Sequence, residues 1–199
     1  MTASQDLRTL NAENWRVATT HAFTNALTDG TLSREQMTGY LQQDCLLAES
    51  FVRRLASAVA HAPTIADAGP ATQFLGLICG TENTCLERLL QALEVPEAQR
   101  ATPETTAFLA LMDEARPSGR FEVMIPILVV AAWVCRDWAT PFEDQAEPLP
   151  VRFGEWITLH SGPGFAGVVA YLRAQLDALW DRLDDAAWAG FPAAKFPAQ

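Results

Sequence analysis

Asp44 is the residue whose type and position in this sequence point most directly to chemistry. It lies in the segment YLQQDCLLAESF, where Tyr40, Leu47 and Phe51 recur at the three- and four-residue spacing of one helix face. A helix in this segment would turn Asp44 inward, and a buried carboxylate is costly unless it is paired or protonated. Such an acid either binds a ligand amine or shuttles a proton, or it only hydrogen-bonds to a neighbouring helix and organises the core. The sequence leaves both roles open.

Three further residues are candidates for catalysis. Glu82, in GLICGTENTCLERLL, has apolar neighbours and is a second candidate buried acid, although a solvated position explains it as well. Cys135 interrupts the apolar run VVAAWVCRDW, where a cysteine acts as a nucleophile once it is deprotonated or, more commonly, fills core space. His160 is a lone imidazole. Trp133, close to Cys135 in the same run, could stack on a flat ligand.

The sequence gives no support for a metal site or a nucleotide site. Helical di-iron proteins need Glu-x-x-His pairs, and none of His21, His61 and His160 has a glutamate three residues before it. The four cysteines form no CxxC pair and have no spacing typical of zinc ligands. There is also no P-loop, GxGxxG or GxSxG motif. We therefore expect neither a metal nor a cofactor.

Charge and hydropathy exclude further classes of partner. Lysine and arginine number 14 against 24 acidic residues, which gives a net charge of −10 and disfavours binding to nucleic acid or an anionic membrane surface. The N-terminus, MTASQDLRTL, lacks the basic and apolar regions of a signal peptide. The most apolar segment, Val123 to Cys135, is too short to span a bilayer and contains Pro126. We expect a reduced, cytoplasmic protein.

Helical periodicity dominates the chain and predicts an all-α bundle of about seven helices. Asp29-Gly30 is a usual helix stop, and Ser33 with Gln36 forms a capping box that starts a long second helix. Gly69-Pro70 is a candidate break in the third helix. We expect one helical domain over residues 1–188 and an irregular tail over residues 189–199. The expected helices cover about residues 4–28, 33–61, 65–93, 103–117, 120–142, a short stretch near Trp156, and 165–188.

Several motifs resemble the TenA/thiaminase II family, which has the haem-oxygenase-like helical fold. The run HAFTNALTDGTLSREQMTGYLQQD is similar to that family's His-Pro-Phe…Asp-Gly-Thr-Leu…Tyr-x-x-Gln-Asp pattern. GTENTCLERLLQALEVP, the segment around Trp133 and GEWITLHSGPGF match weaker landmarks, so the resemblance covers about residues 10–185. It implies a haem-oxygenase-like bundle that assembles as a homodimer or homotetramer.

The resemblance also implies a site for aminopyrimidines related to thiamin. The family's enzymes hydrolyse these compounds with a cysteine nucleophile and an aspartate that binds the pyrimidine amine, and Asp44 corresponds to that aspartate. The nucleophile of the family's Pro-Cys-x-Trp motif corresponds to Ala131, and the tyrosine one turn later corresponds to Cys135. A glutamate near the family's C-terminus has no counterpart. The family's other pocket tyrosines correspond to Leu47, Phe108 and His160.

Three functions are open from the sequence. The first is hydrolysis of a C–N bond in an aminopyrimidine or related amide, as in thiamin salvage. Asp44 would bind the amine, Cys135 or Glu82 would do the chemistry, and His160 would assist the thiol; Leu47, Phe108, Ala131 and Trp133 would line the site. The second is a non-catalytic small-molecule-binding or regulatory protein that keeps the pocket without the nucleophile. The third is an oxygenase that uses haem or a quinone cofactor through His21 or His160.

Overall fold

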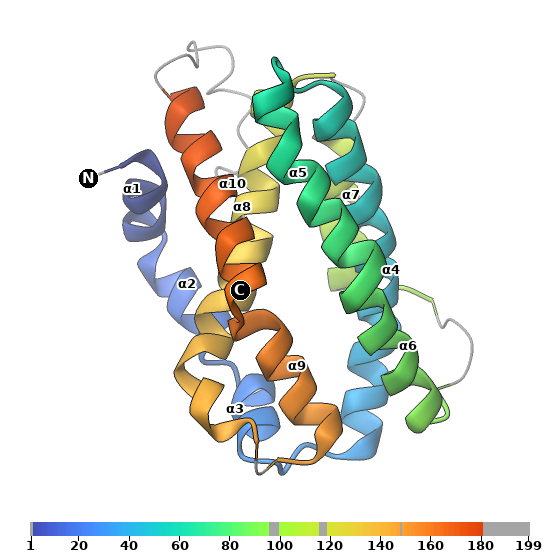
Figure 1. Ribbon diagram of the computed structural model, residues 1–199. Coiled ribbons are helices and arrows are strands. Elements are labelled where there is room, and N and C mark those ends of the chain that lie inside the picture. The colour runs from blue at the N-terminus through green and yellow to red at the C-terminus, as the bar shows by residue number, and fades with distance from the viewer. Residues whose placement is uncertain (1, 96–99, 116–118, 148, 181–199) are drawn as a thin grey trace.

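The computed structural model describes residues 2–95, 100–115, 119–147 and 149–180 (Figure 1). All the regular secondary structure in this part of the chain is helical and none of it is strand, which confirms the all-α prediction. Ten α-helices are joined by a π-helical turn, η1, and a 3-10 segment, η3. In chain order they are α1 (Ala3–Leu10), α2 (Ala12–Thr19), α3 (Ala22–Thr28), α4 (Arg34–Ala60), α5 (Ile65–Leu77), η1 (Ile78–Glu82), α6 (Asn83–Ala92), α7 (Pro103–Ala115), α8 (Phe121–Ala139), η3 (Thr140–Gln145), α9 (Val151–Ser161) and α10 (Pro163–Trp180).

The helix expected over residues 4–28 is divided into α1, α2 and α3, so the described chain has more helices than the seven expected. The side chains of Asn11 and Thr20 each donate a hydrogen bond to the carbonyl one turn earlier, at 2.9 and 2.7 Å. Such bonds compete with the helical ladder and favour helix ends. His21 then caps α3, because its Nδ1 accepts a hydrogen bond from the Phe23 N–H at 3.1 Å.

Other helix boundaries agree with the sequence except in the third helix. The capping box at the start of α4 is present, with the Ser33 hydroxyl accepting the Gln36 N–H at 3.1 Å. The candidate break at Gly69-Pro70 is absent, since α5 continues through this pair. The interruption comes instead at η1, between α5 and α6. The expected end of the last helix near residue 188 and the tail over residues 189–199 lie outside the described residues.

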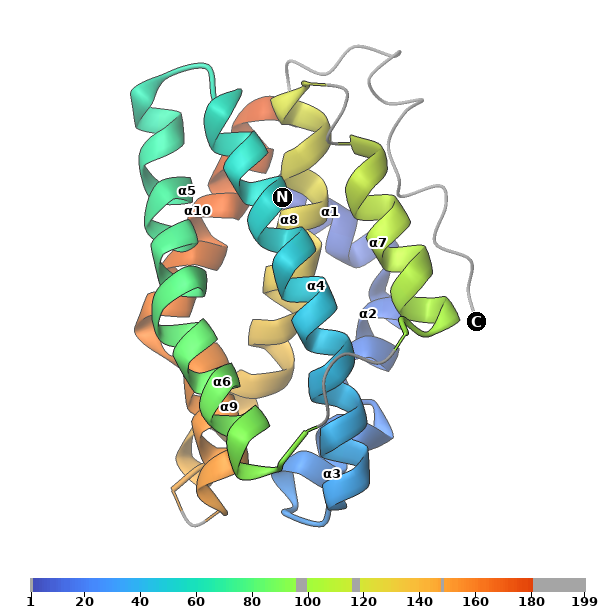
Figure 2. The ribbon, with the colours of Figure 1, turned by 90° about the vertical axis from the view of Figure 1, so that its right-hand side faces the viewer.

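Helix α8 runs through the middle of the bundle in both views (Figures 1 and 2). It packs against α2, α4, α7, α9 and α10. Together with η3 it is long and apolar enough to cross a membrane. This span, Phe121–Gln145, is longer than the apolar segment Val123 to Cys135 that the sequence indicated. In this structure it is a core helix, since its neighbours cover most of its surface. Its buried residues are Phe121, Met124, Ile125, Pro126, Ile127, Leu128, Val129, Ala132, Trp133, Trp138 and Ala139.

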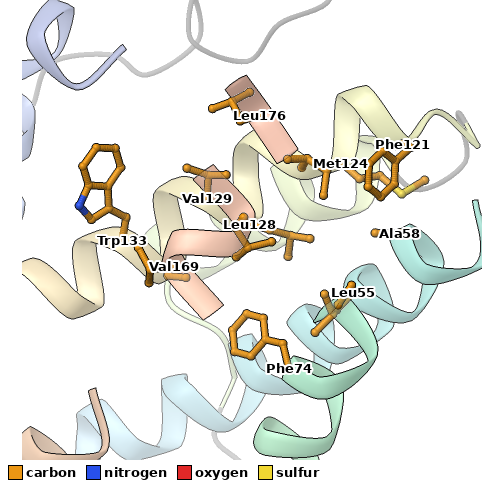
Figure 3. Packing of buried hydrophobic residues seen from close by; sticks show 14 of the residues in the cluster. Leu55, Ala58, Phe74, Phe121, Met124, Leu128, Val129, Trp133, Val169 and Leu176 are labelled. Atoms are coloured by element: carbon orange, nitrogen blue, oxygen red, sulfur yellow. The ribbon is translucent and has the colours of Figure 1, made fainter. Parts of the chain in front are cut away.

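Two large clusters of buried side chains make up most of the core. The first cluster joins α4, α5, α8 and α10, and Figure 3 shows how its members pack. The second cluster joins α3, α4, α6, α8 and α9 toward the lower end of the molecule in Figure 1. Helices α4 and α8 contribute to both clusters. We call the cross-section of the bundle where the first cluster borders the second the seam.

Polar contacts fasten the N-terminal helices to α8 and α10. Asp177 of α10 accepts the Ser4 N–H at the start of α1, at 2.7 Å. Asp137 of α8 accepts the indole N–H of Trp15 at 2.9 Å and pairs with Arg8 at 2.7 Å. The side chain of Asp137 is only 20% exposed, so these two contacts are partly shielded from water. Asp137 therefore links both α1, through Arg8, and α2, through Trp15, to α8.

Replacing Asp137 with alanine should lower the free energy of unfolding by about 1–3 kcal/mol, because a hydrogen bond to a charged group and a shielded ion pair are lost together. Urea denaturation measures this loss. Glu49→Ala is the matched control, since it removes an exposed ion pair to Arg53 and should cost less than about 0.5 kcal/mol. Equal losses in the two variants would contradict the role assigned to Asp137.

Candidate functional site

Asp44 lies at the seam, on the face of α4 that carries Tyr40 toward the second cluster and Phe51 toward the first. The residue as a whole is half-buried, but its carboxyl is surrounded closely enough that burial raises its pKa from 3.8 to about 7. A hydrogen bond donated by the Tyr40 hydroxyl opposes part of this rise. Among the described residues, no positive charge contributes to the pKa of this acid. Near neutral pH Asp44 is therefore present in both protonation states and can accept or donate a hydrogen bond.

His160 is buried in α9 and surrounded by aromatic rings. Ring centroids lie 4.8 Å away for Trp156, 5.0 Å for Phe165 and 5.8 Å for Trp138. Trp138 and Trp156 belong to the second cluster and Phe165 to the first, so His160 also lies at the seam. Its Nδ1 is 2.8 Å from the carbonyl oxygen of Trp156. Because a carbonyl only accepts, Nδ1 carries the proton and Nε2 of the neutral ring is an acceptor.

Burial lowers the pKa of His160 from 6.5 to about 4, and the hydrogen bond to the Trp156 carbonyl opposes part of this shift. The ring is therefore neutral at physiological pH. An imidazole of this kind accepts a hydrogen bond but is a weak base. An ordinary cysteine thiol has a pKa of about 8.5, so His160 would leave such a thiol protonated. The structure thus gives little support to the activating role that the sequence suggested for His160.

Cys135 and Ala131 lie one turn apart on α8, as expected, and both are half-buried. Cys135 packs against both the first and the second cluster, which places it at the seam. It is thus at the same level of the bundle as Asp44 and His160. Ala131, which the motif resemblance puts at the position of the family's nucleophile, carries no reactive group.

Trp133 lies on a different side of α8. At about 100° per residue, it is rotated by about 200° from both Ala131 and Cys135. The Arg173 guanidinium lies 3.8 Å and that of Arg8 5.2 Å from its ring centroid. In Figure 3 the ring projects away from Leu55 and Phe74. Its surface is engaged by side chains of α1 and α10, so the structure does not place Trp133 where it would stack on a ligand held by Asp44.

The remaining predicted residues lie in different surroundings. Leu47 follows Asp44 by one turn of α4 and is half-buried. Phe108 of α7 belongs to a third, smaller cluster, which also includes Phe51. The backbone of Glu82 is in η1, which crosses the seam, but its side chain lies outside the described part of the structure. His21, considered for an oxygenase, is exposed and caps α3. No group of three or more His, Cys, Asp or Glu side chains suited to a metal occurs in the described ranges.

Sequence reasoning missed two residues at the seam. Tyr40 was treated only as part of an apolar stripe, although it donates the hydrogen bond that Asp44 accepts. Its position four residues before an inward-facing acid was a signal for this contact. Trp156 was noted only as the marker of a short helix, yet its ring contacts both Tyr40 and His160. The same four-residue spacing relates Trp156 to His160.

The fold and the seam define an all-α helical bundle that encloses an acid and a neutral imidazole between its two clusters. The chain belongs to the TENA/THI-4/PQQC family, which it matches over residues 9–189. A search of the curated proteins finds no match. The match covers every helix from α2 to α10, including all the residues placed at the seam.

Solved structures share this fold at low sequence identity. A TenA family transcription regulator from Silicibacter sp. TM1040 is 25% identical, with a TM-score of 0.81 over 97% of this chain and 87% of that one. A TenA homologue from P. horikoshii OT3 is 20% identical, with a TM-score of 0.80 over 96% and 93%. A putative TenA-like thiaminase from Sulfolobus solfataricus is 16% identical, with a TM-score of 0.72 over 98% and 92%. The latter two show likeness of fold alone.

Asp44 and His160 should give opposite dependences of stability on pH. The pKa of Asp44 in the folded protein is raised to about 7, so its contribution to the free energy of unfolding falls as the pH rises from about 4 to about 7. The folded pKa of His160 is lowered to about 4, so its contribution is complete above about pH 6.5 and is lost as the pH falls toward 4. The two effects offset each other in the parent protein.

Variants should separate these two effects. Asp44→Asn leaves the His160 effect, so its free energy of unfolding should rise between about pH 4 and pH 6.5 relative to the parent. His160→Asn keeps a donor for the Trp156 carbonyl and leaves the Asp44 effect, so its free energy should fall relative to the parent. Urea denaturation across this range measures both, and identical pH profiles for the three proteins would show that neither group is perturbed.

Proposed function

We propose that this TenA-family protein binds a flat, amine-bearing heteroaromatic ring of the aminopyrimidine class at the seam. The observation that carries the proposal is the carboxyl of Asp44, which is enclosed without a positive charge acting on it. An amine on the ligand would supply a charge-assisted hydrogen bond in surroundings where such a bond is stronger than in water. Binding an amine would also favour the ionised form of Asp44 and offset the cost of its burial.

The neighbours of Asp44 suit a flat and largely apolar ligand. The ring of Tyr40 lies 4.7 Å from that of Phe23 and 6.1 Å from that of Trp156, which supports an aromatic wall beside the acid. Leu47 and Phe108 stand where the family has tyrosines, so fewer polar side chains are available to hold a ligand. Recognition would then depend on Asp44 more than in a site rich in hydroxyl groups.

Two proteins of similar fold have names that suggest different roles, and binding of a small molecule is a property that both roles could share. One is described as a transcription regulator and another as a putative thiaminase. A net charge of −10 disfavours direct contact with nucleic acid. A regulatory role of this chain would therefore act through the small molecule that it binds. We also propose that the protein is cytoplasmic. We propose further that it forms a homodimer or a homotetramer, and its molar mass in solution, measured by light scattering, would show which.

We expect 4-amino-2-methylpyrimidine to raise the melting temperature of the parent protein, and Asp44→Asn to weaken its binding by about tenfold or more. The loss follows from the removal of a charged hydrogen bond, worth about 1.5–3 kcal/mol. Thermal shift and calorimetric titration measure the two effects. Asp144→Asn, the same change at an exposed position of η3, should bind as the parent does. Unchanged affinity in Asp44→Asn would refute the site.

The second candidate function is hydrolysis of such an aminopyrimidine, and the position of Cys135 at the seam favours it. If purified protein releases product from thiamin or a related amide, Cys135→Ser should lower kcat by at least about a thousandfold, because the thiolate is the nucleophile. The melting temperature should stay nearly unchanged. Cys79→Ser, which alters an exposed thiol of η1, is the control. Full activity in Cys135→Ser would exclude the thiol mechanism and make Glu82 the residue to replace.

A further inference from the structure

The indole N–H of Trp156 is a buried hydrogen-bond donor without an acceptor. Trp156 is 1% exposed, and its Nε1 has no hydrogen-bond partner in the described part of the chain. Buried polar groups in folded proteins are nearly always satisfied, so an unpaired donor calls for a specific explanation. A phenylalanine here would fill most of the same space without the unpaired donor. An acceptor brought by a ligand explains why an indole occupies this position.

The position of this donor connects the two polar groups of the seam. The Trp156 ring meets the Tyr40 ring edge to face at a centroid distance of 6.1 Å, and it meets His160 in the same way at 4.8 Å. Tyr40 in turn donates its hydroxyl hydrogen to Asp44. Trp156 is therefore one side chain removed from the enclosed acid and in direct contact with the neutral imidazole.

We infer that Trp156 donates a hydrogen bond from Nε1 to a ring nitrogen of the ligand whose amine is bound by Asp44. This inference rests on the proposed function and assigns its specificity. An aminopyrimidine carries a donor, the amine, and acceptors, the ring nitrogens, within one small flat ring. Asp44 and Trp156 offer the complementary acceptor and donor. A carbocyclic amine of the same shape would satisfy Asp44 but leave the indole N–H unpaired, so the site should select heteroaromatic amines over anilines.

The experiment compares two ligands of equal shape on matched variants of the full chain. 4-Amino-2-methylpyrimidine has ring nitrogens, whereas 3-methylaniline replaces both of them with C–H. We expect the parent protein to bind the pyrimidine about tenfold more tightly than the aniline, and Trp156→Phe to abolish most of this preference. Ser161→Ala is the control, because it removes another buried, unpaired polar atom from the same helix and should keep the preference.

Each outcome bears on the inference. A preference in Trp156→Phe equal to that of the parent overturns it, as expected if a buried water satisfies the indole. An equal loss of affinity for both ligands also overturns it, because Trp156 would then only pack. If Trp156→Phe does not fold, β-(3-benzothienyl)alanine at position 156 keeps the bicyclic ring and replaces the N–H with sulfur, and the same loss of preference is expected. A parent protein that binds neither ligand would instead refute the proposed function.

Discussion

The need to cover α8 on nearly every side is the constraint on which the rest of the structure depends. A helix that is apolar around its whole circumference is stable in water only when other elements surround it. Five helices provide that cover, and each must present an apolar face to α8. The short helix α2 is one of the five, and polar contacts with Asp137 and Asp177 hold it and its neighbour α1 in place.

Burial favours the neutral form of two titratable groups at the seam, the acid Asp44 and the base His160. Desolvation disfavours the charged form of any group, so it raises the pKa of the Asp44 carboxyl and lowers that of the His160 imidazole. Both groups are thereby moved toward their neutral forms near pH 7. The seam is a polar but weakly charged region inside a chain of net charge −10. Such an interior suits a small polar ring better than a strongly anionic ligand.

Membership of the TENA/THI-4/PQQC family fixes the fold but not the chemistry of the seam, since side chains rather than folds carry function. By the resemblance of the motifs, Asp44 corresponds to the aspartate of the family's pocket. By the same resemblance, Ala131, Leu47 and Phe108 correspond to positions where the family's enzymes have groups that hydrogen-bond or react. His160, which the resemblance matches to a tyrosine of the family, has an acceptor nitrogen in place of a hydroxyl. On this correspondence the site keeps the acid and the aromatic side chains around it without the family's catalytic groups, and for this reason we propose binding ahead of hydrolysis.

The sequence by itself determined the all-α class, the start of α4 and the inward position of Asp44. Helical periodicity and capping are local properties, so a few neighbouring residues are enough to specify them. The tertiary structure alone decided the surroundings of Trp133, which depend on Arg8 and Arg173 from distant helices. It also decided the neutral state of His160 and the unpaired indole of Trp156, because desolvation and the absence of an acceptor arise only when several helices close around a side chain. No spacing within one segment of the chain encodes these properties.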